Sequence, residues 1–363
     1  MGKKICFFIG SVSGKGGTER VCIELANNLA ELGYQISIIS LYEGKKPFFT
    51  IHPSINLYEI FDQNQSFTKH VFSIILHIRR LVLNGGYDLF ITVETILCMY
   101  SVPALKLTYP VKHLAWEHFN LEVNFGLRVR KLARRLAANY CTKVIVLTQR
   151  DKQLWESKFK KQNKIVCIPN SVSTPKVQVS DYQTRDKLII AVGRLTYQKG
   201  FDILVKAWAI IANRFPTWKL SIIGSGEDEP ILQNLISSLN LEKSISIIQA
   251  TTQINHYYNS ASIFCLSSRF EGLPMVLIEA QQFGLPIVSF DCNTGPAEVV
   301  THEFNGLLCE PENEKALANS LAICIADSNK RNLFNKAALQ SANRFNTKPV
   351  FSMWIDLFNS IHN

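Results

Sequence analysis

Residues 262–280 read SIFCLSSRFEGLPMVLIEA, which combines an apolar run, a polar turn and a second apolar run. The first run ends near Ser267, has the length of a strand and carries no charge. Because proline suits the first turn of a helix, we expect a helix to begin near Pro274. Glu271 then falls at the end of a strand, and Glu279 lies within a helix among apolar neighbours. The stretch predicts one strand, turn and helix of a parallel sheet.

The same alternation extends in both directions. Apolar runs (ICFFI, QISIIS, DLFITV, VKHLAW, KVIVLT, KIVCIP) precede the polar stretch SVSTPKVQVSDYQTRDK, and further runs (LIIAVG, KLSIIG, SISII, PIVSF) follow it. We expect helices at 19–32, 67–83 and 124–138. Apolar strands separated by helices are typical of parallel sheets covered on both faces. We predict an α/β protein with two doubly wound, Rossmann-like domains, 1–175 and 176–345, that face each other across a cleft.

Length and composition restrict the class of protein. The 363 residues exceed one ordinary core, and 47% hydrophobic with 19% charged residues indicates a globular chain. No apolar run reaches the roughly 20 residues that span a bilayer, and the N-terminal KKICFFIG is too short for a secretory signal. We therefore expect a cytoplasmic protein.

The cysteines and the net charge concern possible ligands. Nine scattered cysteines without a CxxC pair favour buried, reduced thiols over disulfides or a zinc site. The net charge of +10 indicates an anionic partner. Nucleic acid, an anionic membrane and a diphosphate all remain possible at this point.

A glycine-rich loop, GSVSGKGGTER at 10–20, follows the first expected strand. It does not match the P-loop pattern, because only three residues separate Gly10 from Gly14 and because Gly16 follows Lys15. What remains is a glycine turn before a helix that can start at Thr18 and whose free N–H groups could meet an anion. A glycine turn without a ligand fits this segment equally well.

Two further segments of the second half carry suitable charges. AVGRLTYQKG ends a strand with Arg194 and Lys199 just before a helix, an arrangement that suits a diphosphate, although two solvated surface cations fit as well. The Glu279 carboxylate needs a partner, which could be the hydroxyls of a ribose or a structural cation. The backbone N–H groups of Met275 and Val276 would point at a phosphate or a sugar hydroxyl.

In combination these motifs resemble the large retaining glycosyltransferase family 4, of GT-B fold. The E-x7-E signature of that family stands here as Glu271-GLPMVLI-Glu279, together with GRLTYQKGFD, IIGSGE, SASIFCLSS, TGPAEVV and NGLLCEPEN in the order of the family. The opening GGTERVCIELANNLAELGYQISII, and VIVLTQRDK followed by IPNSV, are also similar, so that the resemblance covers nearly the whole chain. It implies an acceptor-binding first domain, a nucleotide-sugar-binding second domain, and a C-terminal helix, 346–363, that crosses back to the first domain.

The resemblance also implies roles for individual residues. Arg194 and Lys199 would neutralise the donor diphosphate, Glu279 would hold the ribose, and Glu271 would contact the transferred sugar. His118 would lie near that sugar and the attacking hydroxyl, whereas a lone histidine after a strand is by itself more often structural. The other implied donor-binding residues are Gly16, Gly17, Gly193, Gly224, Gly272, Leu273, Met275 and Val276.

The implied reaction is a sugar transfer with retention of anomeric configuration. No Asp-x-Asp pair is placed to hold a divalent ion, and GEDEP is typical of the first turn of a helix, so we expect no metal and no cofactor. The substrate would be a nucleotide sugar, with UDP favoured over GDP, that donates a hexose or an N-acetylhexosamine. We expect front-face attack, with the departing phosphate accepting the proton of the acceptor hydroxyl.

The segment LEVNFGLRVRKLARRLAANY accounts for part of the positive charge. It places an apolar stripe of Val129, Leu132, Leu136 and Tyr140 on one helix. The flanking basic residues are Arg128, Arg130, Lys131, Arg134 and Arg135. A basic amphipathic helix indicates an anionic membrane surface or a lipid-linked acceptor, although an ordinary surface helix has the same pattern.

A second apolar and basic candidate is FTKHVFSIILHIRR, at 67–80. We therefore expect peripheral attachment to the inner face of the cytoplasmic membrane. The setting would be the synthesis of surface polysaccharide, lipopolysaccharide or lipid-linked oligosaccharide.

Three alternatives compete with this interpretation. A nicotinamide-dependent Rossmann enzyme would need G-x-G-x-x-G after the first strand, and the glycines here miss that spacing. Nucleic-acid binding would use the charge, but no recognisable motif for it occurs, and we expect no nucleic-acid partner. A non-catalytic relative that binds nucleotide sugars could keep the whole donor pocket, and only product formation separates it from an enzyme.

Overall fold

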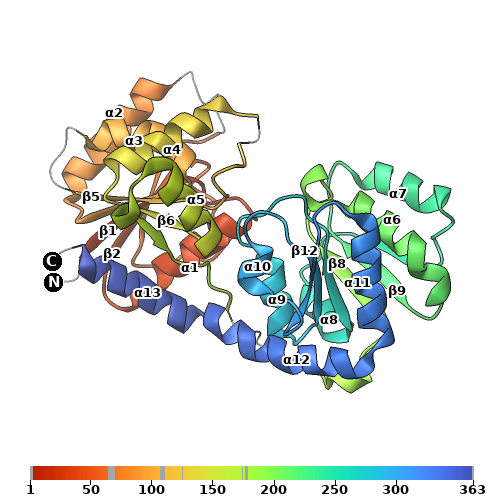
Figure 1. Cartoon of the computed structure of the whole chain (residues 1–363). Coiled ribbons are helices and arrows are strands. Elements are labelled where there is room, and N and C mark those ends of the chain that lie inside the picture. The colour runs from red at the N-terminus through yellow and green to blue at the C-terminus, as the bar shows by residue number, and fades with distance from the viewer. Residues whose placement is uncertain are drawn as a thin grey trace. The chain divides into compact units, whose positions relative to one another are not determined.

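The computed structural model describes residues 3–63, 70–106, 111–124, 126–173, 175 and 179–361. The chain divides into two compact units. Unit 1 consists of the residues up to Asn170 together with the segment from Phe351, and unit 2 spans Ser171–Val350. Each unit contains one parallel sheet with helices on both faces, which confirms the predicted α/β class (Figure 1).

Unit 1 contains a seven-stranded sheet of order β3-β2-β1-β4-β5-β6-β7, in which every neighbouring pair is parallel. Its strands are β1 Lys4–Ser11, β2 Gln35–Tyr42, β3 Asn56–Phe61, β4 Leu89–Val93, β5 Lys112–Trp116, β6 Lys143–Val146 and β7 Ile165–Cys167. The chain runs outward from β1 to β3, then returns to the other side of β1 with β4. The direction of winding therefore reverses between β1 and β4.

Helices cover both faces of this sheet, with α2 and α3 on one face and α1 and α13 on the other (Figure 1). They are α1 Gly17–Glu31, α2 Val71–Gly85, α3 Cys98–Leu105, α4 Arg128–Tyr140, α5 Gln149–Phe159 and α13 Thr347–Ser360. The α13 residues from Phe351 onward belong to unit 1, where Trp354 packs edge-on against Trp116 with the ring centroids 4.8 Å apart. This contact fixes the C-terminal helix near the carboxyl end of β5.

Unit 2 contains a six-stranded parallel sheet of order β10-β9-β8-β11-β12-β13. The strands are β8 Leu188–Val192, β9 Lys219–Ile223, β10 Ile245–Ile248, β11 Ile263–Leu266, β12 Ile287–Phe290 and β13 Gly306–Cys309. The helices are α6 Phe201–Ile211, α7 Glu229–Ser238, α8 Ile254–Ser260, α9 Met275–Gln282, α10 Pro296–Val299, α11 Glu314–Ala326 and α12 Ser328–Ala342. Here the winding reverses between β8 and β11.

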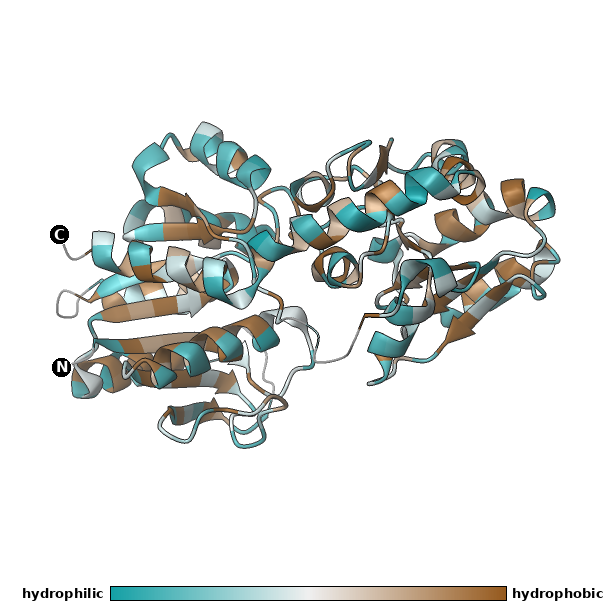
Figure 2. Cartoon of the chain, turned by 90° about the horizontal axis from the view of Figure 1, so that it is seen from below, coloured by the Kyte–Doolittle hydropathy of each residue, from teal (hydrophilic) through white to brown (hydrophobic). Residues whose placement is uncertain are grey.

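The hydrophobic pattern explains these layers. The strands of both sheets are brown in Figure 2, whereas the helices carry hydrophilic residues on their outer sides. In unit 2 the buried side chains of β8, β9, β11 and β12 pack against α6, α7 and α11 in one core. No disulfide joins the nine cysteines, all of which lie in the described ranges, as expected for reduced thiols. None of the described helices is both long and apolar enough to cross a membrane.

The structure shifts or adds several elements relative to the sequence prediction. The helix expected at 67–83 is α2, which begins at Val71, and residues 67–69 lie outside the described residues. The helix expected at 124–138 is α4, which begins at Arg128. Strands β3 and β13 were not predicted, because β3 is a half-exposed edge strand that contains Glu59 and β13 is a partly exposed edge strand that begins at Gly306.

Candidate active site

The loops at the carboxyl ends of strands are where open parallel sheets bind ligands, and the point of reversal is the usual place. In unit 2 that point lies between β8 and β11. The loop after β8 (193–200) carries Arg194 and Lys199, and the loop after β11 (267–274) carries Glu271. The topology thus brings together residues that stand about 70 positions apart in the sequence.

These two loops are fastened to each other by polar contacts. The guanidinium of Arg269 donates to both carboxylate oxygens of Asp202, at 2.9 and 2.7 Å, and to the carbonyl of Tyr197 at 2.7 Å. The Ser267 hydroxyl donates to the carbonyl of Lys199 at 2.9 Å. A bidentate arginine pair is among the stronger and more directional polar contacts in proteins, so that it holds the two loops in a fixed register.

Lys199 and Glu271 form an ion pair at this junction. The Lys199 Nζ donates to Glu271 Oε1 at 2.7 Å, and the two side chains are 15% and 7% exposed. The alkyl part of Lys199 passes Gly193, where an added Cβ would lie only 3.1 Å from its Cε. One predicted cation and one predicted carboxylate are therefore in direct contact at the end of the sheet.

A cavity of about 280 Å³ opens beside this pair and contains several of the predicted donor-binding residues. Its lining residues are Val192, Gly193, Arg194, Ile223, Gly224, Ser225, Ala250, Thr251, Ile254 and Glu279. Gly224 approaches the neighbouring loop so closely that a Cβ would lie 1.8 Å from the carbonyl oxygen of Gly193. The cavity combines apolar walls with one cation and one carboxylate.

The Glu279 carboxylate is held from one side by an aromatic residue. Tyr258 donates its hydroxyl to Glu279 Oε2 at 3.0 Å. The Tyr258 ring is buried and stacks on Phe283 and Phe264, with centroid distances of 5.4 and 6.0 Å. A hydrogen-bonded carboxylate at the wall of a cavity can still accept donors from a bound molecule, because it offers about four lone-pair sites.

Helix α9 contributes its N-terminus to the same region. Pro274 is the N-cap residue, and Met275 and Val276 form the first turn, as predicted. Their side chains are partly exposed, Leu273 is buried, and the Gly272 carbonyl oxygen packs against Gly295. The free N–H groups of this turn thus lie after the same strand as Glu271.

His118 lies in unit 1, directly after β5. Its side chain is 7% exposed and packs against Trp116 with the ring centroids 4.6 Å apart. Among the described residues no hydrogen-bond partner reaches its Nε2. Burial lowers the pKa of His118 to about 3, so that the imidazole is neutral at physiological pH.

Arg134 corrects the sequence prediction, because it does not face the surface. Its side chain is 1% exposed, and its Nε donates to Glu117 Oε2 at 2.8 Å. The remaining donors bind the carbonyls of Leu121, Asn120 and Val123 and the side chain of Asn124, at 2.8–3.1 Å. All five guanidinium N–H donors are thereby used inside the protein, and the residue organises the loop that follows His118.

The rest of the basic helix also differs from the prediction. Ala133 and Ala137 form the contact face of α4, whereas Leu132 and Tyr140 of the predicted apolar stripe are 48% and 51% exposed. Arg130 turns inward and pairs with Glu94 at 3.5 Å. The exposed basic side chains of the predicted set are Arg128, Lys131 and Arg135. The buried face uses small residues because α4 packs closely against α3.

The predicted glycine loop also lies in unit 1. Gly16 is the N-cap residue of α1 and Gly17 its first residue. The Glu19 carboxylate folds back over the loop, so that a Cβ on Gly14 or on Gly16 would lie 2.6 Å from one of its oxygens. A carboxylate at this place makes the loop less suitable for phosphate than the sequence indicated.

Comparison with known proteins identifies the family. Residues 15–176 match the family described as Glycosyltransferase Family 4, and residues 173–341 match Glycosyl transferases group 1. An uncharacterized glycosyltransferase of Haemophilus influenzae is 42% identical over 324 residues, which cover 89% of this chain and 90% of that protein. The chain belongs to glycosyltransferase family 4. Because the chain belongs to this family, it is neither a nicotinamide-dependent Rossmann enzyme nor a nucleic-acid-binding module.

Other relatives of this glycosyltransferase have more specific names. The amylovoran biosynthesis glycosyltransferase AmsD of Erwinia amylovora is 30% identical, with 98% of this chain and 99% of that protein covered. The GalNAc-α-(1→4)-GalNAc-α-(1→3)-diNAcBac-PP-undecaprenol α-1,4-N-acetyl-D-galactosaminyltransferase of Campylobacter jejuni is 26% identical over 99% of both chains.

Solved structures show that the enzyme has the GT-B fold. The lipopolysaccharide outer core galactosyltransferase WaaB, in its apo form, matches with a TM-score of 0.82 and 22% identity over 98% of this chain and 99% of that chain. HepE from Anabaena in complex with UDP matches with a TM-score of 0.82 and 18% identity over 98% of this chain and 100% of that chain.

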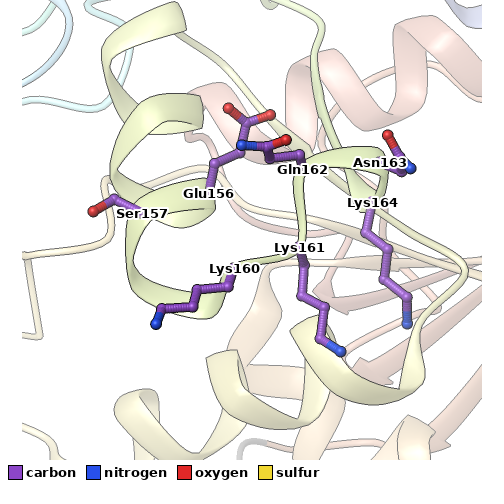
Figure 3. Close-up of a pocket in the computed structure, with 7 residues that line it drawn as sticks. All are labelled: Glu156, Ser157, Lys160, Lys161, Gln162, Asn163 and Lys164. Atoms are coloured by element: carbon purple, nitrogen blue, oxygen red, sulfur yellow. The ribbon is translucent and has the colours of Figure 1, made fainter.

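Another cavity of the glycosyltransferase lies away from these loops. It measures about 660 Å³ and is lined by Glu156 and Ser157 of α5 and by the turn that follows this helix, residues 160–164. Lys160, Lys161 and Lys164 point to one side of that turn and Glu156 to the other (Figure 3). The turn precedes β7, so that this cavity lies at the amino edge of the sheet, opposite the edge where such sheets bind ligands.

Among the described residues, one group of side chains could hold a metal ion. Cys98, His113 and Cys141 are buried, and their ligand atoms lie within 4.8 Å of one another. However, His113 Nε2 shares a hydrogen bond with the hydroxyl of Thr92 at 2.8 Å, and its Nδ1 lies 3.4 Å from the Cys141 sulfur. Burial raises the pKa of the Cys141 thiol, and a structural zinc site usually has four ligands. We therefore interpret these three side chains as a buried hydrogen-bonded cluster and not as a metal site.

Several residues of these sites were not identified from the sequence. Tyr258 and the pair of Arg269 with Asp202 act through contacts between distant segments, and neither belongs to a spaced motif. Glu94 and Glu117 gave a usable signal, because each is a glutamate directly after an apolar strand. Their partners, Arg130 and Arg134, could not be distinguished from the exposed cations by helical spacing alone.

Proposed function

We propose that this enzyme transfers a hexose or an N-acetylhexosamine from a UDP-sugar to a lipid-linked saccharide, with retention of anomeric configuration and without a divalent metal. The observation that carries the donor assignment is the cavity that Glu279 and Arg194 share. Its apolar walls suit a base, its carboxylate suits the vicinal hydroxyls of a ribose, and its cation suits a phosphate. UDP is favoured as the nucleotide because the related fold of HepE was solved in complex with UDP.

The remaining donor contacts follow from the same arrangement. Lys199 would join Arg194 on the diphosphate, and the first turn of α9 would offer N–H groups at Met275 and Val276. Glu271 would accept hydrogen bonds from hydroxyls of the transferred sugar. Gly193, Gly224 and Gly272 would allow the close approach of the backbone to the donor.

The proposed reaction needs no nucleophile from the protein. The bond from the anomeric carbon to the diphosphate oxygen breaks, and the acceptor oxygen bonds to the same face of that carbon. The proton of the acceptor hydroxyl passes to the departing phosphate oxygen, while Arg194 and Lys199 stabilise the negative charge that develops there. His118, which is neutral, would hydrogen-bond to the transferred sugar or to the attacking hydroxyl.

A lipid-linked acceptor and peripheral membrane attachment are supported by α4 and by one relative. Arg128, Lys131 and Arg135 are exposed on α4 beside Leu132. Such a surface suits anionic headgroups or a lipid diphosphate. The Campylobacter jejuni relative is named for a PP-undecaprenol acceptor. We therefore place the enzyme on the inner face of the cytoplasmic membrane.

The test of the donor assignment is thermal stability with UDP, GDP, ADP and NAD, each in the presence of a chelator. A nucleotide at about 100 times its Kd adds roughly 2.7 kcal/mol of stability, which raises Tm by several degrees. We expect UDP to stabilise the enzyme with chelator present, and Glu279→Ala to remove the effect. Stabilisation by NAD alone, or by a nucleotide only after metal is restored, would contradict the proposal.

A non-catalytic relative with an intact donor pocket would pass that test. Product formation is therefore measured separately, by release of UDP from a panel of UDP-glucose, UDP-galactose and their N-acetyl forms. Release that depends on Arg194 and Lys199 supports catalysis. Binding of UDP without any release would favour the non-catalytic alternative.

A further inference from the structure

Glu94 has a backbone conformation that is uncommon for a residue other than glycine. It directly follows β4, and its φ of 74° and ψ of 123° lie outside the regions that side chains with a Cβ usually adopt. Hydrogen bonds fix this conformation, because the Glu94 N–H donates to the carbonyl of Trp116 at 2.8 Å and its carbonyl accepts from Leu97 at 3.1 Å. Such strain persists where the surrounding structure enforces it, and it is common at functional sites.

The position of Glu94 in the sheet is also informative. The winding of unit 1 reverses between β1 and β4, so that its ligand crevice is expected where the loops after these two strands meet. The loop after β1 is the glycine loop covered by the Glu19 carboxylate, and the residue after β4 is Glu94 itself. The two carboxylates belong to neighbouring segments, because β1 pairs with β4. After burial, the charges of Glu117 and Glu19 help to raise the pKa of Glu94.

The Glu94 side chain is held but remains accessible. Its Oε2 accepts from Arg130 at 3.5 Å, and its side chain is 21% exposed, whereas that of Glu117 is 0% exposed. The Arg130 guanidinium also lies over the ring of Phe119, 5.1 Å from the centroid, which fixes its direction. Arg130 thus occupies one acceptor position of a carboxylate that can accept about four hydrogen bonds.

We propose that Glu94 binds hydroxyl groups of the acceptor saccharide, and that Arg130 is the positioning residue that orients its carboxylate. This inference rests on the proposed function and identifies the part of the acceptor that unit 1 binds. A pair of carboxylates repels phosphate but accepts hydrogen bonds from sugar hydroxyls. The crevice between β1 and β4 thus receives the sugar end of the acceptor, and the lipid diphosphate binds elsewhere.

The test compares Glu94→Gln and Glu94→Gly with the matched control Glu303→Gly. Glu303 is also a glutamate with positive φ, 62°, and it pairs with Lys330 at 2.6 Å, but it precedes β13 at the other edge of its sheet. Transfer is measured from the UDP-sugar panel to octyl glycosides of glucose, galactose and their N-acetyl forms. Release of UDP in water, without acceptor, serves as the donor-only readout.

We expect both Glu94 variants to raise the KM for the octyl glycoside about 10- to 100-fold, the loss typical of a charged hydrogen bond. The donor KM, the release of UDP in water and the UDP-induced rise in Tm should not change. Glu94→Gly should have an unchanged or higher Tm, because glycine relieves the strain, and a merely structural role would lower stability and transfer together. Glu303→Gly should leave the acceptor KM unchanged.

The possible failures are distinguishable. An unchanged acceptor KM in both Glu94 variants overturns this inference and leaves the proposed function intact. An equal rise in donor KM assigns Glu94 to the donor and also overturns it. If the wild-type protein neither binds UDP nor releases it from any UDP-sugar, the proposed function fails and this inference fails with it.

Discussion

Lys199 Nζ lies 2.7 Å from Glu271 Oε1, and the pair joins the loop after β8 to the loop after β11 at the point where the sheet of unit 2 reverses its winding. In the proposed reaction these two side chains have opposite tasks, because Lys199 meets the diphosphate and Glu271 meets the sugar. Their contact keeps both charged groups oriented. Each charge also helps to offset the cost of burying the other.

This dependence predicts a specific double-mutant result. Lys199→Met should lower Tm, because it removes a cation that lies 2.7 Å from the largely buried Glu271 carboxylate. Adding Glu271→Gln should recover part of that loss but none of the transferase activity, since both substrate contacts are then absent. Thermal unfolding and UDP release from UDP-sugars measure the two quantities. Lys206→Met, on the exposed side of α6, is the control and should change neither. Recovery of activity in the double variant would contradict the assignment.

The sequence predicted the donor half of the site well because its signals are local. Glycines, a proline and charged residues follow buried strands there, and parallel topology gathers the carboxyl ends of those strands at one edge. Arg194, Gly193, Gly224 and Glu279 therefore share a cavity, as the motifs indicated. Their roles toward a donor stay a prediction.

The orientation of α4 was not predictable from the same kind of signal. Helical periodicity places Leu132 and Tyr140 on one apolar stripe without showing what that stripe faces. The helix buries Ala133 and Ala137, because close packing on α3 favours small side chains. Arg134 is buried because Glu117 and the carbonyls of the following loop supply acceptors for it. Those partners become apparent only when β5, its loop and α4 are seen together.

The two adjacent arginines of α4 should behave differently. Arg134→Met removes five hydrogen bonds, three of them buried and two partly buried, and leaves Glu117 buried without its cation. This change should cost about 3–5 kcal/mol of stability. Arg135→Met, one position further on, alters an exposed side chain and should stay within about 0.5 kcal/mol of the wild type. Chemical denaturation of both variants tests this, and equal stabilities would show that Arg134 is not held as described.

Tyr258 provides a conservative test of the ribose assignment. Tyr258→Phe removes the hydroxyl that donates to Glu279 but keeps the ring stacked on Phe283. The Glu279 carboxylate then loses its orientation, and we expect UDP affinity to fall about 3- to 10-fold, equivalent to roughly 1 kcal/mol for one hydrogen bond. Titration calorimetry measures this change. Tyr257→Phe is the neighbouring control. If it lowered UDP affinity by the same factor, the loss in Tyr258→Phe could not be attributed to the hydrogen bond with Glu279.

The pH dependence of stability can reveal the contribution of the Glu94 carboxyl group. Burial raises its pKa from 4.5 to about 7, although Arg130 opposes this shift, and Glu117 and Glu19 add to it. Between these values the folded state holds a proton that the unfolded state releases, so that the contribution of Glu94 to stability falls as pH rises from 4.5 to 7. Glu94→Gln has no such titration. The variant should therefore gain stability relative to the wild type on going from pH 5 to pH 8, as measured by denaturant midpoints. A constant difference across that range would show that the carboxylate is not desolvated.

Membrane attachment predicts a difference between two sets of exposed cations. Changing Arg128, Lys131 and Arg135 to glutamate reverses three charges on α4 beside the exposed side chain of Leu132, and should release the enzyme from liposomes that contain anionic lipid. The same reversal at Lys158, Lys160 and Lys161 changes the net charge equally but lies around the end of α5. If overall charge governed attachment, both triple variants would dissociate alike.

We expect only the α4 variant to dissociate in sedimentation with liposomes, because each cation near the surface contributes about 1 kcal/mol. Retention of the α4 variant at low salt would show that another surface, such as the exposed Phe72 and Leu76 of α2, makes the contact.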